Sequence, residues 1–599
     1  MIDSAQGTEV MFKQAFHLLL EEHTSKTKDS LKRAAQRRTQ TLEDMQVYIH
    51  RAQIEKFDRI PLIHITGTKG KGSTAAISES ILRNVHNYRT GLFTSPHLLD
   101  IRERIRLDGK PVSKEEFADA YFTLRHRLLK CSTRNNEDND DLPPLPGYFR
   151  MLTLMALYIF TTHTYPPENH LASLQGVDII IMEVGMGGRY DATNLFNKAI
   201  SKHSRPFSAG VALIDLDHTR VLGDTVEKIA WEKGGIFRHS EQPTPVDITK
   251  RFFTIETNTK NVIEVLEKCC LETYEKEENR DNDDIQACES LEIVQMAQGI
   301  PSDWSIGLKG IHQRLNAELA YSLCKSIHSQ TTWFPIHDTD KDGIILNYRK
   351  RNISSNPNFD SGLLKKALHE AFWPGRCQTI SLPNTSIKLH CDGAHTVESM
   401  KECVKWLRIA TEKAHRTQKD GIKRILIFNC SHERNPVPLL NYLLSINDNE
   451  SAVDDTNSEF FSKVYFCRAD SERPSMVAKA SAMSLLLDAG YDIENLSTEQ
   501  TEKGTWQDTL ARIWTFMLNL RQLQKVPSDG SLKANVVTNK TVKKALHLIL
   551  EENMTDNSSF STKYGDINIH ICVTGSLYIV GSALQAAGWE EISSPPSHV

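Results

Sequence analysis

Short apolar runs that end in small or polar residues recur along the chain, and stretches with helical spacing of apolar residues separate them. Six such runs cover residues Pro61–Ile65, Asp178–Glu183, Val211–Leu216, Ile422–Asn429, Val464–Cys467 and Ile569–Thr574. Runs of this length are typical of strands that helices cover on both faces, as in a parallel sheet. The alternation of strand-like and helix-like segments therefore predicts an α/β fold with mainly parallel sheets.

The chain is long enough to bury more than one core. It has 599 residues, and we predict two domains joined by a linker. The alternation of strand-like and helix-like segments is weakest over Thr331–Pro357, which contains Asp-Thr-Asp-Lys-Asp-Gly. A second apolar core begins near Trp373. We therefore predict a larger domain at 1–340, a linker at 341–365 and a smaller domain at 366–599.

Acidic and polar runs interrupt both predicted domains. They are Asn135–Asp141, Glu275–Asp284 and Asn447–Glu459. Such segments bury too little apolar area to offset the entropy of ordering them. We predict that they are surface insertions that carry no chemistry.

Charge and cysteine content narrow the class of protein. The net charge of −5 gives no global attraction to nucleic acid or to an anionic membrane. The 11 cysteines include no C-x-x-C pair, so we expect reduced thiols and neither disulfides nor structural zinc. The longest apolar stretch, Met151–Phe160, is too short to cross a bilayer and predicts a buried helix.

The first forty residues give evidence on the cellular compartment of the protein. The apolar run Phe16–Leu20 is short and is followed by Glu21 and Glu22, which argues against a secretory signal. The basic stretch Lys26–Arg38 suggests a mitochondrial transit peptide, but nearby acidic residues argue against one. We expect a cytoplasmic protein, and the mitochondrial matrix stays open as the alternative.

Segment 64–74 carries the strongest chemical signal. Its sequence, His-Ile-Thr-Gly-Thr-Lys-Gly-Lys-Gly-Ser-Thr, joins a strand-like run to the helix-like run Ala75–Leu82. Glycines let backbone N–H groups crowd around an anion, Lys71 supplies a positive charge, and a Ser-Thr pair opens the helix, whose N-terminus favours negative charge. The spacing differs from G-x-x-x-x-G-K-[ST], because an extra glycine separates the lysine from the serine. The flanking strand and helix favour a triphosphate-binding loop over the alternative, a polar surface loop.

Two strand ends carry side chains that suit a hard cation. Glu183 closes a strand-like run and precedes a glycine-rich turn, where a carboxylate could hold a cation that bridges phosphates. Ser95 lies in Thr-Ser-Pro-His-Leu after another short strand-like segment, and its hydroxyl could complete a magnesium site. Considered alone, the Glu183 carboxylate could equally cap the following turn, and the Ser95-Pro96 pair could simply form a turn.

Three more side chains are candidates for binding. His218 follows the predicted strand Val211–Leu216, where a neutral imidazole could bind a second metal ion. Lys233 follows an amphipathic helix. In the helix that begins at His312, the spacing puts His312 and Asn316 on one face, suited to reach a base or a ribose. Ordinary structural roles stay open for all of these residues.

These segments occur in an order that resembles the folylpolyglutamate synthases of the Mur-ligase-like superfamily. The motifs that carry the resemblance are Gly-Thr-Lys-Gly-Lys-Gly-Ser, Thr-Ser-Pro-His-Leu, Glu-Val-Gly-Met-Gly-Gly-Arg-Tyr-Asp-Ala-Thr-Asn, Asp-His-Thr with Leu-Gly-Asp-Thr, Glu-Lys-Gly-Gly-Ile, His-Gln-x-x-Asn-Ala, Trp-Pro-Gly-Arg-Cys-Gln, Cys-Asp-Gly-Ala-His-Thr, Phe-Asn-Cys with Arg-Asn-Pro, and Thr-Gly-Ser-Leu. The resemblance covers the chain from about residue 45 onward.

The resemblance implies a P-loop NTPase-like N-terminal domain with a mainly parallel sheet and a smaller Rossmann-like α/β C-terminal domain. It also implies roles for single residues. ATP would be bound by Gly70, Lys71, Gly72, Ser73, Asn316, Arg376 and Asp392, magnesium would be held by Ser95, Glu183 and His218, and the catalytic residues would be Lys71, Lys233 and His395. Lys233 matches a position that family members carry as a carbamylated lysine, and His395 matches the site of the incoming glutamate.

The chain departs from the family pattern at a few positions. Gly234 stands where alanine is usual, and Asn435 stands where aspartate is usual. Neither is a proposed metal ligand, and we expect both to be tolerated. Lys69 stands where bacterial two-function relatives commonly have asparagine, which favours the eukaryotic polyglutamating type.

The activity that the resemblance implies is the ATP-dependent addition of L-glutamate to the γ-carboxylate of a reduced folate. The γ-phosphoryl group of ATP would pass to the carboxylate, and the amine of glutamate would attack the resulting acyl phosphate. Domain closure around the linker would complete the site and exclude water. ATP and Mg²⁺ are the expected cofactors, with a second divalent cation or potassium left open, and we expect a monomer that binds small molecules but no nucleic acid.

Three alternatives stay open. A dihydrofolate synthase or a two-function enzyme would share nearly every motif. A phosphotransferase would need the phosphate loop but not the motif that runs from Asp392 to His395. An inactive nucleotide-binding protein would be expected to lack Lys71, Glu183 or His218, and all three are present.

Overall fold

The structure, a computed structural model, divides into two compact units. The first contains Met1–Gly307 and Gln313–Phe372, and the second contains Leu308–His312 and Trp373–Val599. The residues that the structure describes are 2–24, 37–54, 57–132, 142–165, 174–195, 206–237, 251–275, 291–333, 359–383, 385–412, 422–432, 434–446, 460–470, 480–491, 504–523, 535–539, 541–555 and 568–590.

An eight-stranded sheet forms the centre of the first unit. Its strand order is β10-β9-β8-β1-β7-β2-β3-β4; neighbours from β10 to β2 are parallel, and β3 and β4 are added antiparallel. The elements of this unit are α1 (Ile2–His23), η1 (Arg38–Gln40), α3 (Thr41–Ala52), η2 (Phe57–Arg59), β1 (Leu62–Thr66), α4 (Lys71–His86), β2 (Thr90–Phe93), η3 (Ile101–Arg104), β3 (Ile105–Leu107), β4 (Lys110–Pro111), α5 (Lys114–Ser132), α6 (Tyr148–Thr162), β5 (Thr164–Tyr165), β6 (Leu174–Gln175), β7 (Ile179–Glu183), β8 (Phe207–Val211), α7 (Thr219–Leu222), α8 (Val226–Gly234), β9 (Phe252–Ile255), α9 (Lys260–Glu275), β10 (Leu291–Val294), α10 (His312–Trp333) and α11 (Ser361–Glu370).

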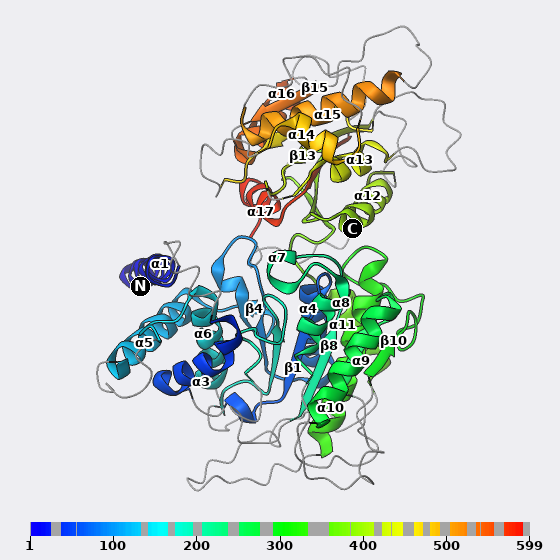
Figure 1. The fold of residues 1–599 in the computed structure, drawn as a ribbon. Helices are drawn as coiled ribbons and strands as arrows, with labels where there is room; N and C mark the ends of the chain where they lie inside the picture. Colours follow the sequence, from blue (N-terminus) through cyan, green and yellow to red (C-terminus); the bar gives the residue numbers. More distant parts are fainter. Residues whose placement is uncertain are drawn as a thin grey trace, which may run out of the picture. The chain divides into compact units, whose positions relative to one another are not determined.

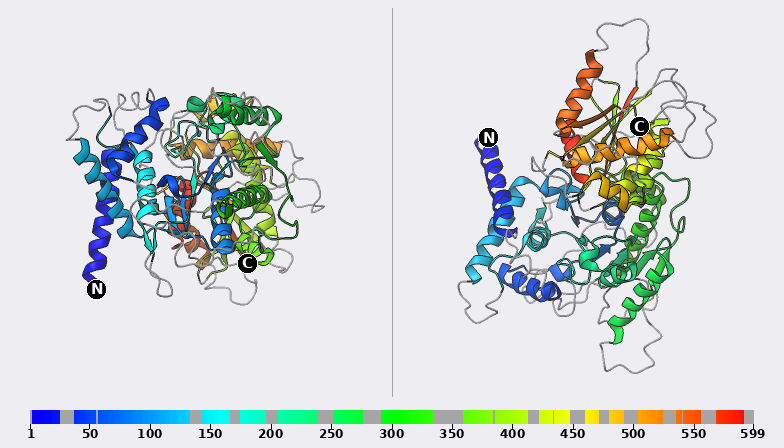
Figure 2. Two further views of the ribbon diagram at one scale, coloured as in Figure 1. Left: turned by 90° about the horizontal axis from the view of Figure 1, so that it is seen from below. Right: turned by 45° about the horizontal axis from the view of Figure 1, so that its top comes forward.

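Helices cover both faces of this sheet. Figures 1 and 2 show α3, α5 and α6 grouped on one side of it, and α4, α10 and α11 on the other. Every residue of β1, β7 and β8 is buried, because a strand covered on both faces needs apolar or small residues at successive positions. Helix α6 is also buried along most of its length, since it packs between the sheet and the helices α3 and α5.

The register of the central strands sets the location of the site. Ile65 of β1 lies level with Glu183 of β7, and Thr66 lies level with Val211 of β8. Three parallel strands therefore end at one edge of the sheet. The loops that follow them at this edge are the usual place for ligands in open α/β sheets.

A six-stranded sheet forms the centre of the second unit. Its order is β11-β12-β16-β13-β14-β15, and every neighbouring pair is parallel except β11 with β12. Residues from α12, α13, α14 and α15 share one apolar core with this sheet, and α16 packs against α17. The elements are β11 (Gln378–Ser381), β12 (Ile387–Asp392), α12 (Val397–Glu412), β13 (Ile422–Phe428), α13 (Val437–Leu444), β14 (Lys463–Cys467), α14 (Ala482–Asp488), α15 (Trp506–Leu523), β15 (Asn535–Asn539), α16 (Val542–Thr555), β16 (Asn568–Thr574) and α17 (Leu577–Ala586).

Most sequence-based predictions of the fold are confirmed, and one strand was misplaced. The α/β class with mainly parallel sheets is confirmed in both units. The strand predicted at Val211–Leu216 is wrong, because β8 covers Phe207–Val211 and residues 212–218 form a loop. The earlier residues Phe207, Ser208, Ala209 and Gly210 are buried small or aromatic residues, which carry a weaker strand signal than the following Val-Ala-Leu-Ile.

Some predictions concern residues outside the described ranges. These are the bulk of the predicted linker, over 341–358, most of the basic stretch Lys26–Arg38, and the three acidic runs apart from Glu275. The exact domain bounds stay predictions. Within the described ranges, every helix falls short of the length or the apolar character that a bilayer-spanning segment needs.

Candidate phosphate-binding site

The predicted phosphate loop joins β1 to α4 at the carboxyl edge of the first sheet. β1 ends at Thr66 and α4 begins at Lys71. Gly70, at the N-cap, has a φ of 87°, which a residue with a side chain rarely adopts. A Cβ on Gly70 would collide with the amide of Asn316. The backbone therefore favours glycine here, and any side chain at this position would have to displace the Asn316 amide.

Two lysine ammonium groups converge on one carbonyl of this loop. Lys71 Nζ donates to Gly67 O at 3.0 Å, and Lys233 Nζ donates to the same oxygen at 2.7 Å. Burial, and after it the charge of Lys71, holds the pKa of Lys233 well below its ordinary value. Both proposed catalytic lysines of the first unit thus lie beside the phosphate loop.

Asn316 supports the loop from α10. Its side chain is buried, its Nδ2 donates to Gln313 Oε1 at 2.9 Å, and its Oδ1 lies against Gly70. The structure therefore brings Asn316 to the phosphate loop rather than leaving it on a free helix face. Ser73 is buried in the first turn of α4, next to Gly72.

Glu183 and Ser95 come together at the same edge of the sheet. Glu183 is the last residue of β7 and is buried. The backbone N–H of Ser95 donates to Glu183 Oε2 at 3.0 Å. Two of the three predicted metal ligands are therefore neighbours.

His218 lies in a different environment. Its φ of 50° puts it in the left-handed region at the N-cap of α7, and its side chain is 54% exposed beside Asp217, with the two side chains 3.7 Å apart. In the part of the chain that the structure describes, no group of three or more His, Cys, Asp or Glu side chains is arranged to hold a metal ion. A second-metal role for His218 stays a prediction.

The glycine-rich turn after β7 is tied to β1 by buried polar groups. Thr66 Oγ1 donates to Gly187 O at 2.6 Å, and His64 Nε2 lies 3.0 Å from Thr193 Oγ1. Asp191 accepts from Thr193 N and Oγ1 at 2.9 and 2.6 Å, and burial raises the pKa of its carboxyl. We did not predict a role for Asp191 from the sequence, although it stands inside the quoted motif.

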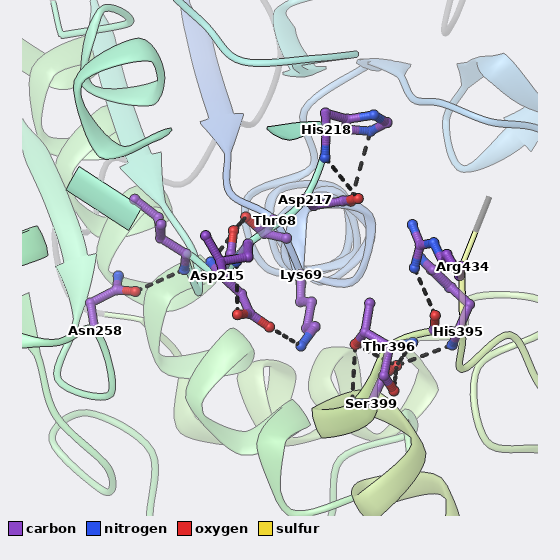
Figure 3. Close-up of polar contacts among 12 residues, drawn as sticks. Thr68, Lys69, Asp215, Asp217, His218, Asn258, His395, Thr396, Ser399 and Arg434 are labelled. Carbon is purple, nitrogen blue, oxygen red and sulfur yellow. Dashed lines mark hydrogen bonds and ion pairs between the residues drawn. The ribbon is translucent and has the colours of Figure 1, made fainter. Parts of the chain in front are cut away.

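A second network that sequence reasoning missed joins the phosphate loop to the loop after β8. Thr68 N and Lys69 N donate to Leu213 O at 2.7 and 3.1 Å, and Lys69 Nζ binds Asp215 Oδ2 at 2.6 Å. Asn258 fixes the same loop, because its amide accepts from Ile214 N at 2.8 Å (Figure 3). The available signal was the aspartate in Leu-Ile-Asp-Leu-Asp-His, which follows a strand as Glu183 ends one.

Lys233 is positioned by the short helix α8. Thr225 caps its N-terminus by accepting from Lys228 N at 3.3 Å, and Lys233 lies in its last turn, not in the turn beyond as the sequence pattern indicated. The next residue, Gly234, faces α9: a Cβ there would lie 2.7 Å from Cys269 Sγ and 2.8 Å from Cys269 Cβ. The close approach of α9 leaves little room for a side chain at this position.

We therefore expect Gly234→Ala to lower the stability of the first unit by roughly 1–3 kcal/mol, because the methyl group overpacks the contact with Cys269. Thermal or denaturant unfolding measures the effect. Gly7→Ala in α1 is the matched control, since a Cβ there meets nothing within 4 Å and a helical alanine is favoured by up to about 1 kcal/mol. Equal stability of Gly234→Ala and wild type would contradict the overpacking.

In the second unit, Asp392 ties two turns together. It is the last residue of β12, and it accepts from Ala394 N at 2.9 Å and from Cys377 N at 2.8 Å. Cys377 Sγ also lies 3.4 Å from the same carboxylate. Burial, and next the charge of Asp392, raises the pKa of the Cys377 thiol well above its ordinary value, so the thiol stays a donor. Arg376 precedes this cysteine and is partly exposed.

His395 stands in the turn before α12. Its Nδ1 lies 2.7 Å from Gly393 O, its N–H donates to Ser399 Oγ at 3.1 Å, and Arg434 Nη1 donates to its carbonyl at 2.7 Å (Figure 3). Asn435 lies two residues before α13, its Oδ1 accepts from Val437 N at 3.0 Å, and its Nδ2 donates to Leu485 O at 2.9 Å. An aspartate could not donate that second bond, which accounts for asparagine at this position.

The fold and the loop define a class of protein: a phosphate-loop α/β protein in which a second, mainly parallel α/β unit follows the first. Known proteins narrow this class. No protein-family model matches the chain. Among curated proteins, the folylpolyglutamate synthase of Saccharomyces cerevisiae (strain FostersO) is 31% identical over 553 residues, which is 91% of this chain and 81% of the relative. That of Arabidopsis thaliana is 30% identical over 554 residues, covering 88% of this chain and 80% of the relative. The chain belongs to the folylpolyglutamate synthase family.

The match is shorter in mammalian relatives. The mitochondrial folylpolyglutamate synthase of Homo sapiens is 36% identical over 408 residues, and the match spans 67% of this chain but only 60% of the relative. Among solved structures, Mycobacterium tuberculosis folylpolyglutamate synthase complexed with ADP and AMPPCP has a TM-score of 0.59 at 19% identity, with 97% of this chain and 99% of the other covered. Escherichia coli FolC in complex with DHPP and ADP has a TM-score of 0.52 at 18% identity, with 91% and 92% covered. These structural likenesses support the two-unit α/β fold.

Proposed function

We propose that this chain is an ATP-dependent ligase that adds L-glutamate to the γ-carboxylate of a reduced folate and so builds folylpoly-γ-glutamates. The observation that carries the proposal is the convergence of Lys71 and Lys233 on Gly67 O, at the phosphate loop of a chain in this family. The names of the curated relatives support the choice of substrate. Amide formation from a carboxylate needs an activated acyl group, and transfer of a phosphoryl group from ATP supplies one.

The charges of the first unit suit that transfer. ATP and a carboxylate substrate repel each other, so the site has to balance negative charge while it aligns donor and acceptor. In this proposal Lys71 and the N–H groups at the start of α4 bind phosphate oxygens. The carboxylate oxygen takes the γ-phosphoryl group, the glutamate amine attacks the acyl carbon, and phosphate leaves with the amine proton lost to solvent or a base.

Magnesium fits two of the residues proposed for it. Mg²⁺ takes oxygen ligands and commonly uses one or two protein side chains together with water and substrate phosphates. Ser95 and Glu183, which are in contact through the Ser95 N–H, supply a hydroxyl and a buried carboxylate of that kind. Bound there, the ion would neutralise phosphate charge during transfer.

The depressed pKa of Lys233 supports a chemical rather than a purely structural role for this residue. A buried lysine with a second lysine beside it has a larger neutral fraction than an ordinary lysine, and a neutral amine is the form that reacts with carbon dioxide or accepts a proton. We keep carbamylation of Lys233 as part of the proposal. His395, Arg376 and Asp392 are the proposed glutamate and ATP contacts of the second unit.

The proposal is tested by incubating the purified full chain with ATP, Mg²⁺, L-glutamate and either tetrahydrofolate or dihydropteroate, and by resolving products by mass spectrometry. A ladder of glutamyl units on tetrahydrofolate, dependent on ATP, is the expected result. Glutamylation of dihydropteroate would make the chain a dihydrofolate synthase or a two-function enzyme. ADP formation without a glutamylated product would favour a phosphotransferase, and no reaction at all would favour an inactive nucleotide-binding protein.

The compartment and the assembly state are part of the same proposal. We propose a cytoplasmic monomer that binds small molecules but no nucleic acid. The word mitochondrial in the names of mammalian relatives keeps the mitochondrial matrix as the alternative. Cell fractionation and size-exclusion chromatography with light scattering test these two points.

A further inference from the structure

A carboxylate holds the first lysine of the phosphate loop. Lys69 Nζ lies 2.6 Å from Asp215 Oδ2, and the two side chains are only 19% and 27% exposed. Figure 3 shows the Lys69 side chain extended toward Asp215. Partial burial weakens the screening of this pair by water and salt. The loop therefore contains a lysine whose charge is directed to a protein carboxylate.

Asp215 is fixed in place by contacts that do not depend on Lys69. Its backbone N–H donates to Thr68 Oγ1 at 3.1 Å, and Thr68 Oγ1 donates to its carbonyl at 3.0 Å. Its second carboxylate oxygen, Oδ1, accepts from Leu216 N at 2.8 Å. The carboxylate is therefore held beside the phosphate loop whether or not Lys69 is bound to it.

We propose that Asp215 is a positioning residue that weakens nucleotide binding by holding Lys69 away from the phosphates and by adding a negative charge beside them. The inference rests on the proposed function, because it takes the loop over residues 67–73 to bind the phosphates of ATP. It goes beyond that function, since it assigns to one residue the task of limiting affinity rather than creating it.

The sign of the effect follows from charge. ATP carries several negative charges, so a nearby carboxylate raises the free energy of the bound state and a free lysine lowers it. Asp215 does both, because it repels the phosphates and occupies Lys69. Limited affinity has a use in a ligase that adds one glutamate per ATP, because ADP has to leave before the next cycle, and product release often limits turnover.

The test replaces Asp215 by asparagine in the full chain and measures ATP and ADP binding by isothermal titration calorimetry. Asparagine keeps the acceptor for Leu216 N and leaves the backbone bonds to Thr68 intact, so only the charge is removed. We expect both nucleotides to bind roughly three- to tenfold more tightly, with the gain shrinking at high salt. Glu264→Gln on α9 is the matched control, because it removes one negative charge from an exposed ion pair with Lys260 and should leave affinity unchanged.

A double-mutant cycle separates this role from a structural one. Lys69→Gln leaves Asp215 without its lysine, so the variant should bind ATP more weakly than wild type, and Lys69→Gln with Asp215→Asn should return close to wild type. Damage to the loop would weaken binding in every variant and could not produce the gain expected of Asp215→Asn. Circular dichroism and the unfolding temperature verify that each variant is folded.

The outcomes are distinct. ATP binding by wild type with unchanged or weaker binding by Asp215→Asn would overturn this inference and leave the proposed function standing. If Asp215→Asn does not fold, the Lys69→Gln variant decides the question. ATP binding by Lys69→Gln with the affinity of wild type would overturn the inference. A failure of wild type and all variants to bind ATP would overturn the inference and the proposed function together.

Discussion

Replacing Lys71 by methionine is expected to lower kcat/KM for the proposed ATP-dependent glutamylation by roughly 10²- to 10³-fold, the usual cost of removing one preorganised group that stabilises transition-state charge. Methionine keeps most of the unbranched stem but loses the ammonium group that donates to Gly67 O at 3.0 Å. That ammonium stands at the first residue of α4, beside the N–H groups that would face the phosphates. Initial rates over a range of ATP concentrations, with products resolved by mass spectrometry, measure the loss.

The same substitution should change Lys233. The positive charge of Lys71 is the second cause of the low pKa of Lys233, after burial, so removing it should raise that pKa and protonate Lys233 over a wider range of pH. The remaining activity should therefore have a pH profile displaced to higher pH. Lys260→Met is the matched control, because Lys260 is 88% exposed on α9 and should retain full activity. An activity of Lys71→Met within twofold of wild type would show that this lysine has no essential role in the reaction.

The central architecture was predictable from the sequence because it depends on local patterns. Glu183 closes a run of four apolar residues, and this run is β7 in the structure. The glycine-rich turn between β1 and α4 was predictable for the same reason, since strand, glycines and helix are contiguous over residues 62–86. Glu183 and Ser95 could be associated in advance because parallel strands present their carboxyl ends at one edge.

Contacts between distant segments were not predictable in the same way. The choice of Asp215 as the partner of Lys69 depends on the path of residues 212–218 after β8, and the sequence placed that strand a few residues too late. Cys377, whose Sγ lies 3.4 Å from Asp392 Oδ2, has a φ of 44°, which no residue pattern indicates. Gly234 is explained by Cys269 of another helix. In each case the deciding feature is a tertiary contact or a backbone angle, which local sequence patterns do not encode.

The stability of the first unit should depend strongly on one buried ion pair, and Arg89→Ala is expected to lower its free energy of unfolding by roughly 3–5 kcal/mol. Arg89 and Asp178 are 6% and 1% exposed. Asp178 Oδ2 accepts from Arg89 N at 2.8 Å and from Arg89 Nε at 3.0 Å, and the guanidinium also contacts Asp178 through Nη2. Without the guanidinium, a carboxylate in a nearly water-free position loses its counter-charge.

Because this pair joins the starts of two neighbouring strands, its loss should affect the sheet and not only the two residues. Arg89 immediately precedes β2 and Asp178 immediately precedes β7, and these strands are paired in the sheet. Their opposite ends lead to Ser95 and Glu183. Weakening the pair should therefore loosen the start of both strands. In hydrogen–deuterium exchange, the increase in exchange rate relative to wild type should be larger in β2 and β7 than in β9 and β10.

A bidentate arginine in a less buried ion pair provides the matched control. Arg125 binds Glu22 through Nε at 2.7 Å and Nη2 at 2.5 Å, with the two side chains 32% and 23% exposed. Water reaches the Arg125 guanidinium more easily than that of Arg89, so Arg125→Ala should cost clearly less than Arg89→Ala, about 1 kcal/mol. Arg89→Met combined with Asp178→Asn should recover part of the stability, because it removes both buried charges and keeps an acceptor for the Arg89 backbone N–H. If Arg89→Ala unfolded at the same denaturant concentration as Arg125→Ala, burial would not determine the strength of these pairs, and the expected importance of Arg89 would be wrong.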